Sequence, residues 1–170
     1  MKHIIIKGIG PDKPGIVSRI SGIVTTNSGN IEESRMIRLG SEFSIIMMIK
    51  IPEKDEKNLS KELESIDGIT FYLTETKKLH NLENPTHVIN LTGGDTEGIV
   101  HKMTDVFTSM GINIIEITTD TRNAPVSGST IFEMIAKINL NNSSPEKLTA
   151  KLKELERKLG VEITLDTIQS

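Results

Sequence analysis

The stretch Gly10-Pro-Asp-Lys-Pro-Gly-Ile-Val17 returns later in the chain, partly changed, as Gly93-Gly-Asp-Thr-Glu-Gly-Ile-Val100. Aligning Gly15 with Gly98 places the two halves 83 residues apart. At that offset further pairs carry the same residue, namely Asp12 and Asp95, Thr25 and Thr108, Asn30 and Asn113, and Glu33 and Glu116. The demands of a core explain the shared isoleucine and valine, but not a shared acid, glycine and asparagine. The chain is therefore one structural unit written twice.

The length of the chain fits two small domains. Its 170 residues are enough for one ordinary domain or for two of roughly 80 residues, and the repeat decides for two. A unit that small buries only about 60 to 65% of the surface that its unfolded chain exposes, so each half is marginally stable alone. We therefore expect the protein to associate with itself as a homodimer.

The first half has the predicted order β-α-β-β-α-β. Apolar residues at i, i+1, i+4, i+7 and i+8 predict a helix that begins at the Pro14-Gly15 step, and Gly40 joins two strands into a hairpin. The predicted elements are a strand over His3–Ile9, a helix over Ile16–Val24, strands over Ile31–Leu39 and Glu42–Ile51, a helix over Asp55–Ile66 and a strand over Ile69–Thr76. Right-handed crossovers turn this order into a four-stranded antiparallel sheet with both helices on one face, the ferredoxin-like arrangement of the α+β class.

The second half repeats the order with a longer hairpin. Its predicted elements are strands over Thr86–Thr92, Asn113–Arg122, Ser129–Leu140 and Val161–Ile168 and helices over Glu97–Met110 and Pro145–Lys158. Phe43 aligns with Phe132, six residues beyond the offset of 83, and the extra loop is Asn123-Ala-Pro-Val-Ser-Gly128. The segment Lys77–Pro85 has no periodic apolar stripe. We therefore predict domains over residues 1–78 and 86–170, joined by a linker over 79–85.

The composition argues against several classes of function. The chain has no cysteine, which excludes disulfides, thiolate zinc sites and Cys-X-X-Cys redox chemistry and fits a reducing cytoplasm. A net charge of −3 and an aromatic content of 3% argue against a nucleic-acid surface. The apolar runs Ile4–Ile6 and Ile45–Ile49 are too short to cross a bilayer. We expect a cytoplasmic protein that is neither secreted nor bound to membranes and that does not bind nucleic acid directly.

The turn before the first helix predicts a small-molecule site. The amides of a first helical turn have no partner inside the helix and lie at the positive end of its dipole, where a carboxylate binds well. Gly15 has no Cβ to block the approach to these amides near Ile16. Asp12 stands beside the same position and, with the side-chain oxygen of Asn30, suits a positive group. A zwitterion satisfies both, so we expect a free amino acid, with Asn30 contributed by a neighbouring domain or chain.

The second half keeps this set in a weaker form. Asp95, Gly98, Ile99 and Asn113 occupy the matching positions, but Thr96-Glu97 replaces Lys13-Pro14 and adds negative charge near the carboxylate position. An alternative interpretation covers both halves: each aspartate caps its own helix, and each asparagine completes a helix-to-strand turn. The protein would then be a protein-interaction and dimerisation module without a ligand.

Catalytic and metal sites lack their partner residues. The histidines at positions 3, 80, 87 and 101 form no i, i+4 ligand pair, and Ile16-Val17 stands where a phosphate-binding loop needs lysine and a hydroxyl residue. We therefore expect no metal, no cofactor, no catalytic residue and no enzyme activity. One remote alternative is a hydrolase, because Gly15-Ile-Val-Ser-Arg19 resembles the acylphosphatases, which bind phosphate with an arginine of the first helix. Asp12 would repel their substrate.

The segment Asp12-Lys-Pro-Gly-Ile-Val17, followed by Gly29-Asn30-Ile31, resembles the ACT domain, a small regulatory module that binds amino acids. The resemblance covers both halves. It implies a ligand at a domain interface, held by Asp12, Pro14, Gly15, Ile16 and Asn30 and, in the second copy, by Asp95, Gly98, Ile99 and Asn113.

The tandem arrangement, with the loop Ala124-Pro-Val-Ser-Gly-Ser-Thr-Ile-Phe132, resembles the glycine cleavage system transcriptional repressor family. That resemblance implies a regulator of glycine metabolism that acts through a protein partner and responds to glycine, serine or a similar amino acid. The opening motif also resembles the regulatory domain of formyltetrahydrofolate deformylases.

Overall fold

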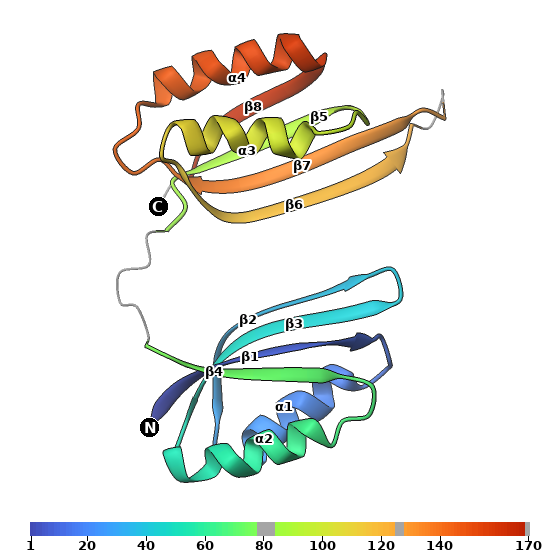
Figure 1. The fold of residues 1–170 in the computed structure, drawn as a ribbon, viewed down its shortest axis with the longest axis vertical. Coiled ribbons are helices and arrows are strands. Elements are labelled where there is room, and N and C mark those ends of the chain that lie inside the picture. Colours follow the sequence, from blue (N-terminus) through green and yellow to red (C-terminus); the bar gives the residue numbers. More distant parts are fainter. Residues whose placement is uncertain (78–83, 125–127, 169–170) are drawn as a thin grey trace. The chain divides into compact units, whose positions relative to one another are not determined.

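The computed structural model describes residues 1–77, 84–124 and 128–168. The chain divides into two compact units, Met1–His80 and Asn81–Ser170, which we call the first and the second unit. Each unit has the order β-α-β-β-α-β (Figure 1). Residues 79–83 of the predicted linker and residues 125–127 of the predicted long loop lie outside the described residues.

The first unit is a four-stranded antiparallel sheet with two helices on one face (Figure 1). Its elements are β1 Lys2–Pro11, α1 Ile16–Thr26, β2 Asn30–Leu39, β3 Glu42–Ile51, the short 3-10 helix η1 Glu53–Asp55, α2 Glu56–Glu64 and β4 Thr70–Thr76. The strand order is β2-β3-β1-β4, so β2 and β4 are the edge strands. The face of the sheet that carries no helix is called the open face below.

The second unit repeats this architecture. Its elements are β5 His87–Gly94, α3 Ile99–Ser109, β6 Asn113–Asn123, β7 Thr130–Asn139, α4 Pro145–Leu159 and β8 Val161–Thr167. The strand order β6-β7-β5-β8 is that of the first sheet, with β6 and β8 at the edges. The α+β, ferredoxin-like fold predicted for both halves is confirmed.

Each unit has its own hydrophobic core, built from a helical stripe and a strand alternation. In α1 the buried residues Ile16, Ile20 and Val24 recur every fourth position, and α3 repeats this spacing with Ile99, Met103 and Phe107. Alternate residues of the two central strands pack against these helices, namely Ile4, Ile6, Phe43, Ile45, Met47, Ile49 and Ile51 in the first unit and Ile89, Leu91, Phe132, Met134, Ala136 and Ile138 in the second. The two periods are those that the sequence displays.

Close packing explains the first glycine of the repeated stretch. A Cβ on Gly10 would lie 2.2 Å from the carbonyl oxygen of Gly68, and a Cβ on Gly93 would lie 2.5 Å from Cγ1 of Val161. The end of the first strand of each unit therefore passes too close to its neighbour for any side chain. This glycine serves the fold, so the acid, the second glycine and the asparagine are the residues that remain to be explained.

Membrane-spanning helices and metal sites can be checked over residues 1–77, 84–124 and 128–168. None of the helices there has the length and the apolar content that a membrane span requires. In the same described part of the chain, no group of three or more His, Cys, Asp or Glu side chains is arranged to hold a metal ion.

Candidate functional site

The repeated stretch forms a tight turn at one end of the first unit, between β1 and α1. Gly15 has φ 85° and ψ −2°, and the amide of Ile16 donates to the carbonyl oxygen of Lys13 at 3.3 Å. These are the features of a type II turn, which favours proline at its second position and needs a positive φ at its third. Pro14 therefore lies before the helix, and the prediction that it belongs to the first helical turn is wrong.

The N-terminus of α1 carries no side-chain cap. Gly15 is the residue before the helix, and no side chain in the described part of the chain accepts a hydrogen bond from the amides of the first turn. Asp12 does not reach back to them: its own amide donates to the carbonyl oxygen of Ser41 at 2.8 Å, and its carboxylate lies 3.9 Å from Nε of Arg38. The interpretation of Asp12 as a helix cap is therefore wrong, and the amides at the positive end of the helix that begins after Gly15, three residues beyond Asp12 in the chain, are uncapped.

The second unit repeats this geometry. Gly98 has φ 79° and ψ 12°, and α3 likewise has no side-chain cap. Asp95 is therefore not a cap either. Its main-chain amide donates to the carbonyl oxygen of Thr130 at 3.3 Å. Thr96 turns its hydroxyl back to the carbonyl oxygen of Gly94, and Glu97 is exposed beside the turn.

The isoleucines of the two turns belong to the cores. The exposed fraction of Ile16 is 7% and that of Ile99 is 2%, and both side chains pack in the hydrophobic cluster of their unit. Only their backbone could contact a guest. The amide of Ile16 is already bonded within the turn, so the amides that follow it are the better donors.

Asn30 lies at the opposite end of the sheet from the turn. It pairs with Lys50 at one end of β3, whereas Leu39 pairs with Glu42 at the other end, next to Ser41. Eight residues of β3 separate these positions, which is about 27 Å along an antiparallel strand. Asp12 and Asn30 of one unit therefore cannot hold the same small molecule.

The second sheet separates its residues in the same way. Asn113 pairs with Asn139, and Asn123 pairs with Thr130, whose carbonyl oxygen accepts from the amide of Asp95. In both units a site that uses the acid and the asparagine together needs one residue from each of two units, which is the arrangement expected from the sequence.

A β-bulge follows each asparagine on its edge strand. The register shifts between Ile31 and Glu33 in β2 and between Ile114 and Glu116 in β6. Bulges of this kind re-aim side chains and are frequent next to functional sites. The bulge is a shared feature of the two units that periodicity alone did not reveal.

Charged partners at both ends of the first unit were also missed by sequence reasoning. At the turn, Arg38 faces Asp12, and Nζ of Lys13 lies 3.8 Å from the carboxylate of Asp67. At the asparagine end, Nε2 of His3 lies 3.2 Å from the carboxylate of Glu32. Only the folded structure brings these residues together, so spacing along the sequence carries no signal for them.

Arg19, which would bind phosphate if the protein were a hydrolase of the acylphosphatase kind, contacts the backbone of its own unit. The guanidinium group of Arg19 donates to the carbonyl oxygen of Ser65 at 3.3 Å, at the C-terminal end of α2.

A shallow groove of about 280 Å³ on the second unit, between α3 and α4, is lined by Lys102, Asp105, Val106, Lys151, Glu154, Leu155 and Lys158 and contains none of the predicted site residues.

Comparisons with known proteins identify the family of the chain. Residues 2–67 match the model of the ACT domain. The glycine cleavage system transcriptional repressor of Escherichia coli (strain K12) is 43% identical over 47 residues, a match that covers 28% of this chain and 25% of the repressor. The UPF0237 protein MMP0657 of Methanococcus maripaludis is 32% identical over 68 residues, which cover 39% of this chain and 76% of that protein.

A solved structure matches the whole chain. The crystal structure of an unknown protein from Galdieria sulphuraria is 29% identical to this chain, and the alignment covers 99% of both chains with a TM-score of 0.85. Two sheets of ACT topology, the ACT model on the first unit and a relative matched over most of its length lead to one assignment. The chain belongs to the ACT-domain family, as a tandem pair of ferredoxin-like units that resembles the glycine cleavage system transcriptional repressors.

Proposed function

We propose that this protein is a non-catalytic regulator that binds a free amino acid, such as glycine or serine, between the turn of one unit and the asparagine end of another. Binding joins two units and changes the surface that a partner protein meets. By similarity to the repressor of Escherichia coli, the regulated process is transcription of genes for glycine metabolism. The proposal includes self-association as a homodimer, because units of this size are marginal alone.

The observation that carries the proposal is the pairing of an uncapped helix N-terminus with a nearby carboxylate. The amides after Gly15 offer donors to an α-carboxylate, and Asp12 offers an acceptor to an α-ammonium group. A simple anion would be repelled by Asp12, and a simple cation would be repelled by the helix dipole. A zwitterion matches both charges, and the same arrangement occurs at Asp95 and Gly98.

Strand order supports a contribution of Asn30 from a second unit. Asn30 begins β2, an edge strand whose far end carries Arg38 and Leu39. An antiparallel strand laid along such an edge would bring its own first residue beside Leu39. The contact between Arg38 and Asp12 indicates that this position is within one side chain of the turn. The side-chain oxygen of Asn30 could then share the ammonium group with Asp12.

The proposed site implies a modest affinity. Charge-assisted hydrogen bonds contribute about 1.5 to 3 kcal/mol each, and ordering a small ligand offsets part of this gain. Dissociation constants from roughly micromolar to millimolar follow, which suit a sensor of metabolite pools. The site of the second unit, with Asp95, Gly98, Ile99 and Asn113, should be weaker because Glu97 adds negative charge.

Thermal denaturation against the twenty amino acids tests the proposal. A ligand at one hundred times its dissociation constant stabilises the native state by about 2.7 kcal/mol, which raises the melting temperature by several degrees. Asp12→Asn removes the charge that holds the ammonium group and should abolish the shift for the ligand of the first unit. Asp67→Asn is the matched control, because Asp67 lies at the same end of the unit with its side chain 99% exposed.

Three results bear on the proposal. A shift in wild type that persists in Asp67→Asn and disappears in Asp12→Asn supports it. A flat melting temperature with all twenty amino acids contradicts it and favours the alternative of an interaction module without a ligand. A shift that survives Asp12→Asn unchanged contradicts the assignment of the site.

A further inference from the structure

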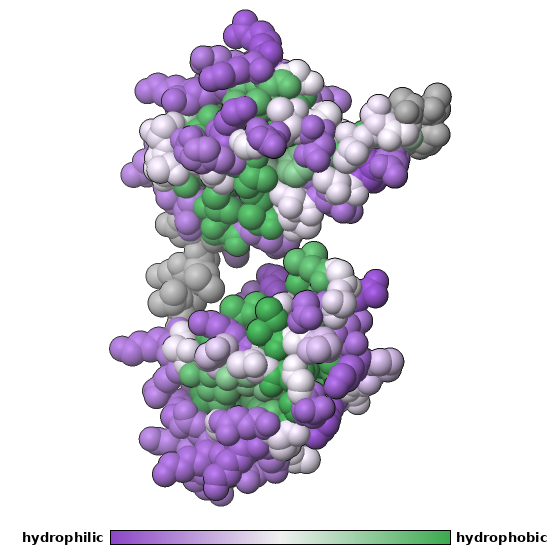
Figure 2. Space-filling view, turned by 45° about the vertical axis from the view of Figure 1, so that its right-hand side comes forward, coloured by the Kyte–Doolittle hydropathy of each residue, from purple (hydrophilic) through white to green (hydrophobic). Residues whose placement is uncertain are grey.

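The open face of the first sheet is apolar to an extent that the fold does not require. Its side chains follow from the strand register in three rows, Arg35-Ile46-Lys7-Tyr72, Ile37-Ser44-Ile9-Thr70 and Glu33-Met48-Ile5-Thr74. The exposed fraction is 47% for Ile46, 48% for Ile37, 51% for Ile9 and 63% for Tyr72. Hydrophobic residues are also visible at the surface of this unit (Figure 2).

The second unit provides an internal control for this observation. The matching rows of its open face are Thr118-Ile135-Asn90-Thr164, Asp120-Glu133-Thr92-Glu162 and Glu116-Lys137-Val88-Asp166. Apolar residues fill six of the twelve positions in the first sheet but two of the twelve in the second. Because both sheets fold with the same topology, the additional apolar surface of the first unit has a role other than folding.

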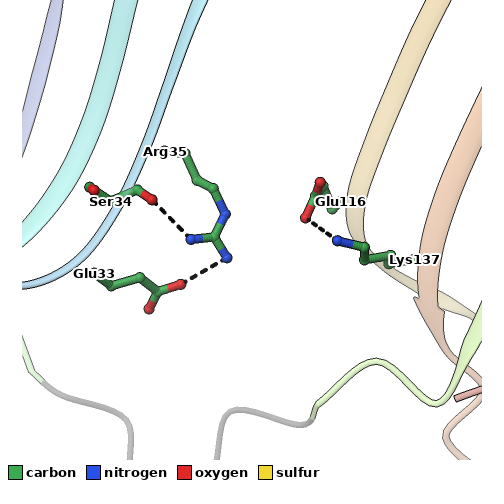
Figure 3. A network of polar contacts seen from close by, with 5 residues as sticks. All are labelled: Glu33, Ser34, Arg35, Glu116 and Lys137. Atoms are coloured by element: carbon green, nitrogen blue, oxygen red, sulfur yellow. Dashed lines mark hydrogen bonds and ion pairs between the residues drawn. The ribbon is translucent and has the colours of Figure 1, made fainter. Parts of the chain in front are cut away.

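The charges of the two open faces are opposite once local ion pairs are removed. In the first sheet Arg35 pairs with Glu33 at 3.1 Å, and in the second Lys137 pairs with Glu116 at 3.1 Å (Figure 3). Arg122 also pairs with Glu133, at 2.7 Å. Among the described residues, the charges left without an ion-pair partner are Lys7, Lys50 and Glu42 on the first open face and Asp120, Glu162 and Asp166 on the second, so these charges sum to +1 on the first face and −3 on the second.

We propose that the open face of the first sheet is a docking surface and that its occupant is the open face of the second sheet of another copy of this chain. The cations of one face then meet the carboxylates of the other, and Ile135 and Val88 lie against the apolar rows. Two copies related by a two-fold axis form this contact twice. The three rows lie between the ends that carry the amino-acid site, and only Lys50 is at such an end, where it pairs with Asn30. The inference therefore does not depend on that ligand.

The area of the surface favours a reciprocal dimer. A four-stranded sheet about 19 Å wide, with strands of seven residues or more, presents a face of roughly 450 Å². One contact buries about 900 Å² in total, which is below the usual size of a stable interface. Two contacts bury about 1,800 Å², which is within the standard range. A pair of copies therefore reaches the area that a single contact does not.

Sedimentation velocity of the full chain without amino acids tests the proposal. Wild type should sediment as a dimer whose dissociation constant rises with salt, because the contact is partly ionic. Ile46→Glu, in the centre of the apolar face, should raise the dissociation constant at least tenfold. Val100→Glu is the matched control, since Val100 is an exposed apolar residue on a helix, and it should leave dimerisation unchanged. Circular dichroism confirms that each variant is folded.

A charge exchange identifies the occupant. Lys7→Glu with Lys50→Glu, and separately Glu162→Lys with Asp166→Lys, should each raise the dissociation constant at least tenfold. The chain with all four changes should regain the wild-type constant within about threefold, as complementary charges are restored. Lys57→Glu with Lys61→Glu on α2 makes the same change in net charge away from both faces and should have no effect.

Three results would overturn the proposal. The first is a wild-type chain that remains monomeric at protein concentrations up to 100-fold above the lowest concentration that the assay detects. The second is a dimer that Ile46→Glu leaves intact. The third is a chain with all four charge changes that does not regain the wild-type dissociation constant, since the occupant would then be another surface. Asp12→Asn should leave this dimer unchanged, so loss of the amino-acid site and loss of the docking surface are distinguishable.

Discussion

Replacement of Gly15 by alanine tests the assignment of the turn that precedes α1. Gly15 has a φ of 85°, and an added Cβ would meet nothing within 4 Å, so the cost is backbone strain alone. A left-handed conformation costs an alanine roughly 1 to 2 kcal/mol, of which about 0.4 to 1 kcal/mol is regained because alanine restricts the unfolded chain. The variant should be less stable than wild type by about 1 kcal/mol.

Gly22→Ala supplies a matched control within the same helix. Gly22 lies inside α1, has no positive φ and also meets nothing within 4 Å of an added Cβ. The same chemical change should therefore stabilise the helix by about 0.5 to 1 kcal/mol. The two alanine variants should differ by about 2 kcal/mol in the free energy of unfolding, with opposite signs relative to wild type.

Urea unfolding followed by tyrosine fluorescence measures this difference in the first unit of the protein, which contains both glycines. The chain has one tyrosine and no tryptophan, and the tyrosine is Tyr72 in β4 of the first unit. With a slope of about 1 kcal/mol per molar urea for a unit of this size, the midpoints should fall by about 1 M in Gly15→Ala and rise by about 0.7 M in Gly22→Ala. Equal midpoints for the two variants would show that the turn does not require a positive φ at Gly15.

Three other perturbations follow from the contacts of single side chains. Asn27→Ala removes a buried amide that joins α1 to α2, and should cost about 1 to 3 kcal/mol in the same fluorescence assay. Ser144→Ala removes the N-cap of α4 and should cost about 1 kcal/mol by circular dichroism. The Ser144 hydroxyl also lowers the pKa of Glu146. The stability that comes from this contact is present above the unfolded pKa near 4.5 and is lost as the pH falls through the folded pKa. The free energy of unfolding should therefore fall more steeply with acid in wild type than in Ser144→Ala. Arg38→Ala frees the carboxylate of Asp12 from an exposed ion pair and, by calorimetry, should tighten amino-acid binding up to about fivefold.

The fold could be predicted from the sequence because its signals are local and occur twice. Buried faces follow from the spacing of four residues between Ile16, Ile20 and Val24 and from the alternation of apolar residues in β1 and β3. The repeat shows the pattern of each element a second time. Element ends were less accurate. A helix start at the Pro14-Gly15 step was expected, but a positive φ at Gly15 places that residue outside the helix. Residue type alone does not distinguish a proline inside a first turn from one inside a type II turn.

The candidate site could be predicted only in its types of residue. Chain order indicated that Asp12, Gly15 and Asn30 matter together, but their separation along the sheet depends on strand register. Register also places Arg38 beside Asp12 and His3 beside Glu32, and no spacing rule connects residues of different strands. The contrast between the two open faces likewise appears only after the strands are paired, since half of the residues of each strand face the core.

In the proposed site one amino acid contacts the turn of one unit and the asparagine end of another at the same time. A ¹H–¹⁵N correlation spectrum of the chain, titrated with the amino acid that raises the melting temperature, tests this directly. We expect the amides of Asp12–Val17 and those of Asn30–Glu33 to shift with the same dissociation constant, although about 27 Å separates the two groups within one unit. Shifts confined to one of the two groups, or two different dissociation constants, would mean that no single ligand joins the turn to the asparagine end.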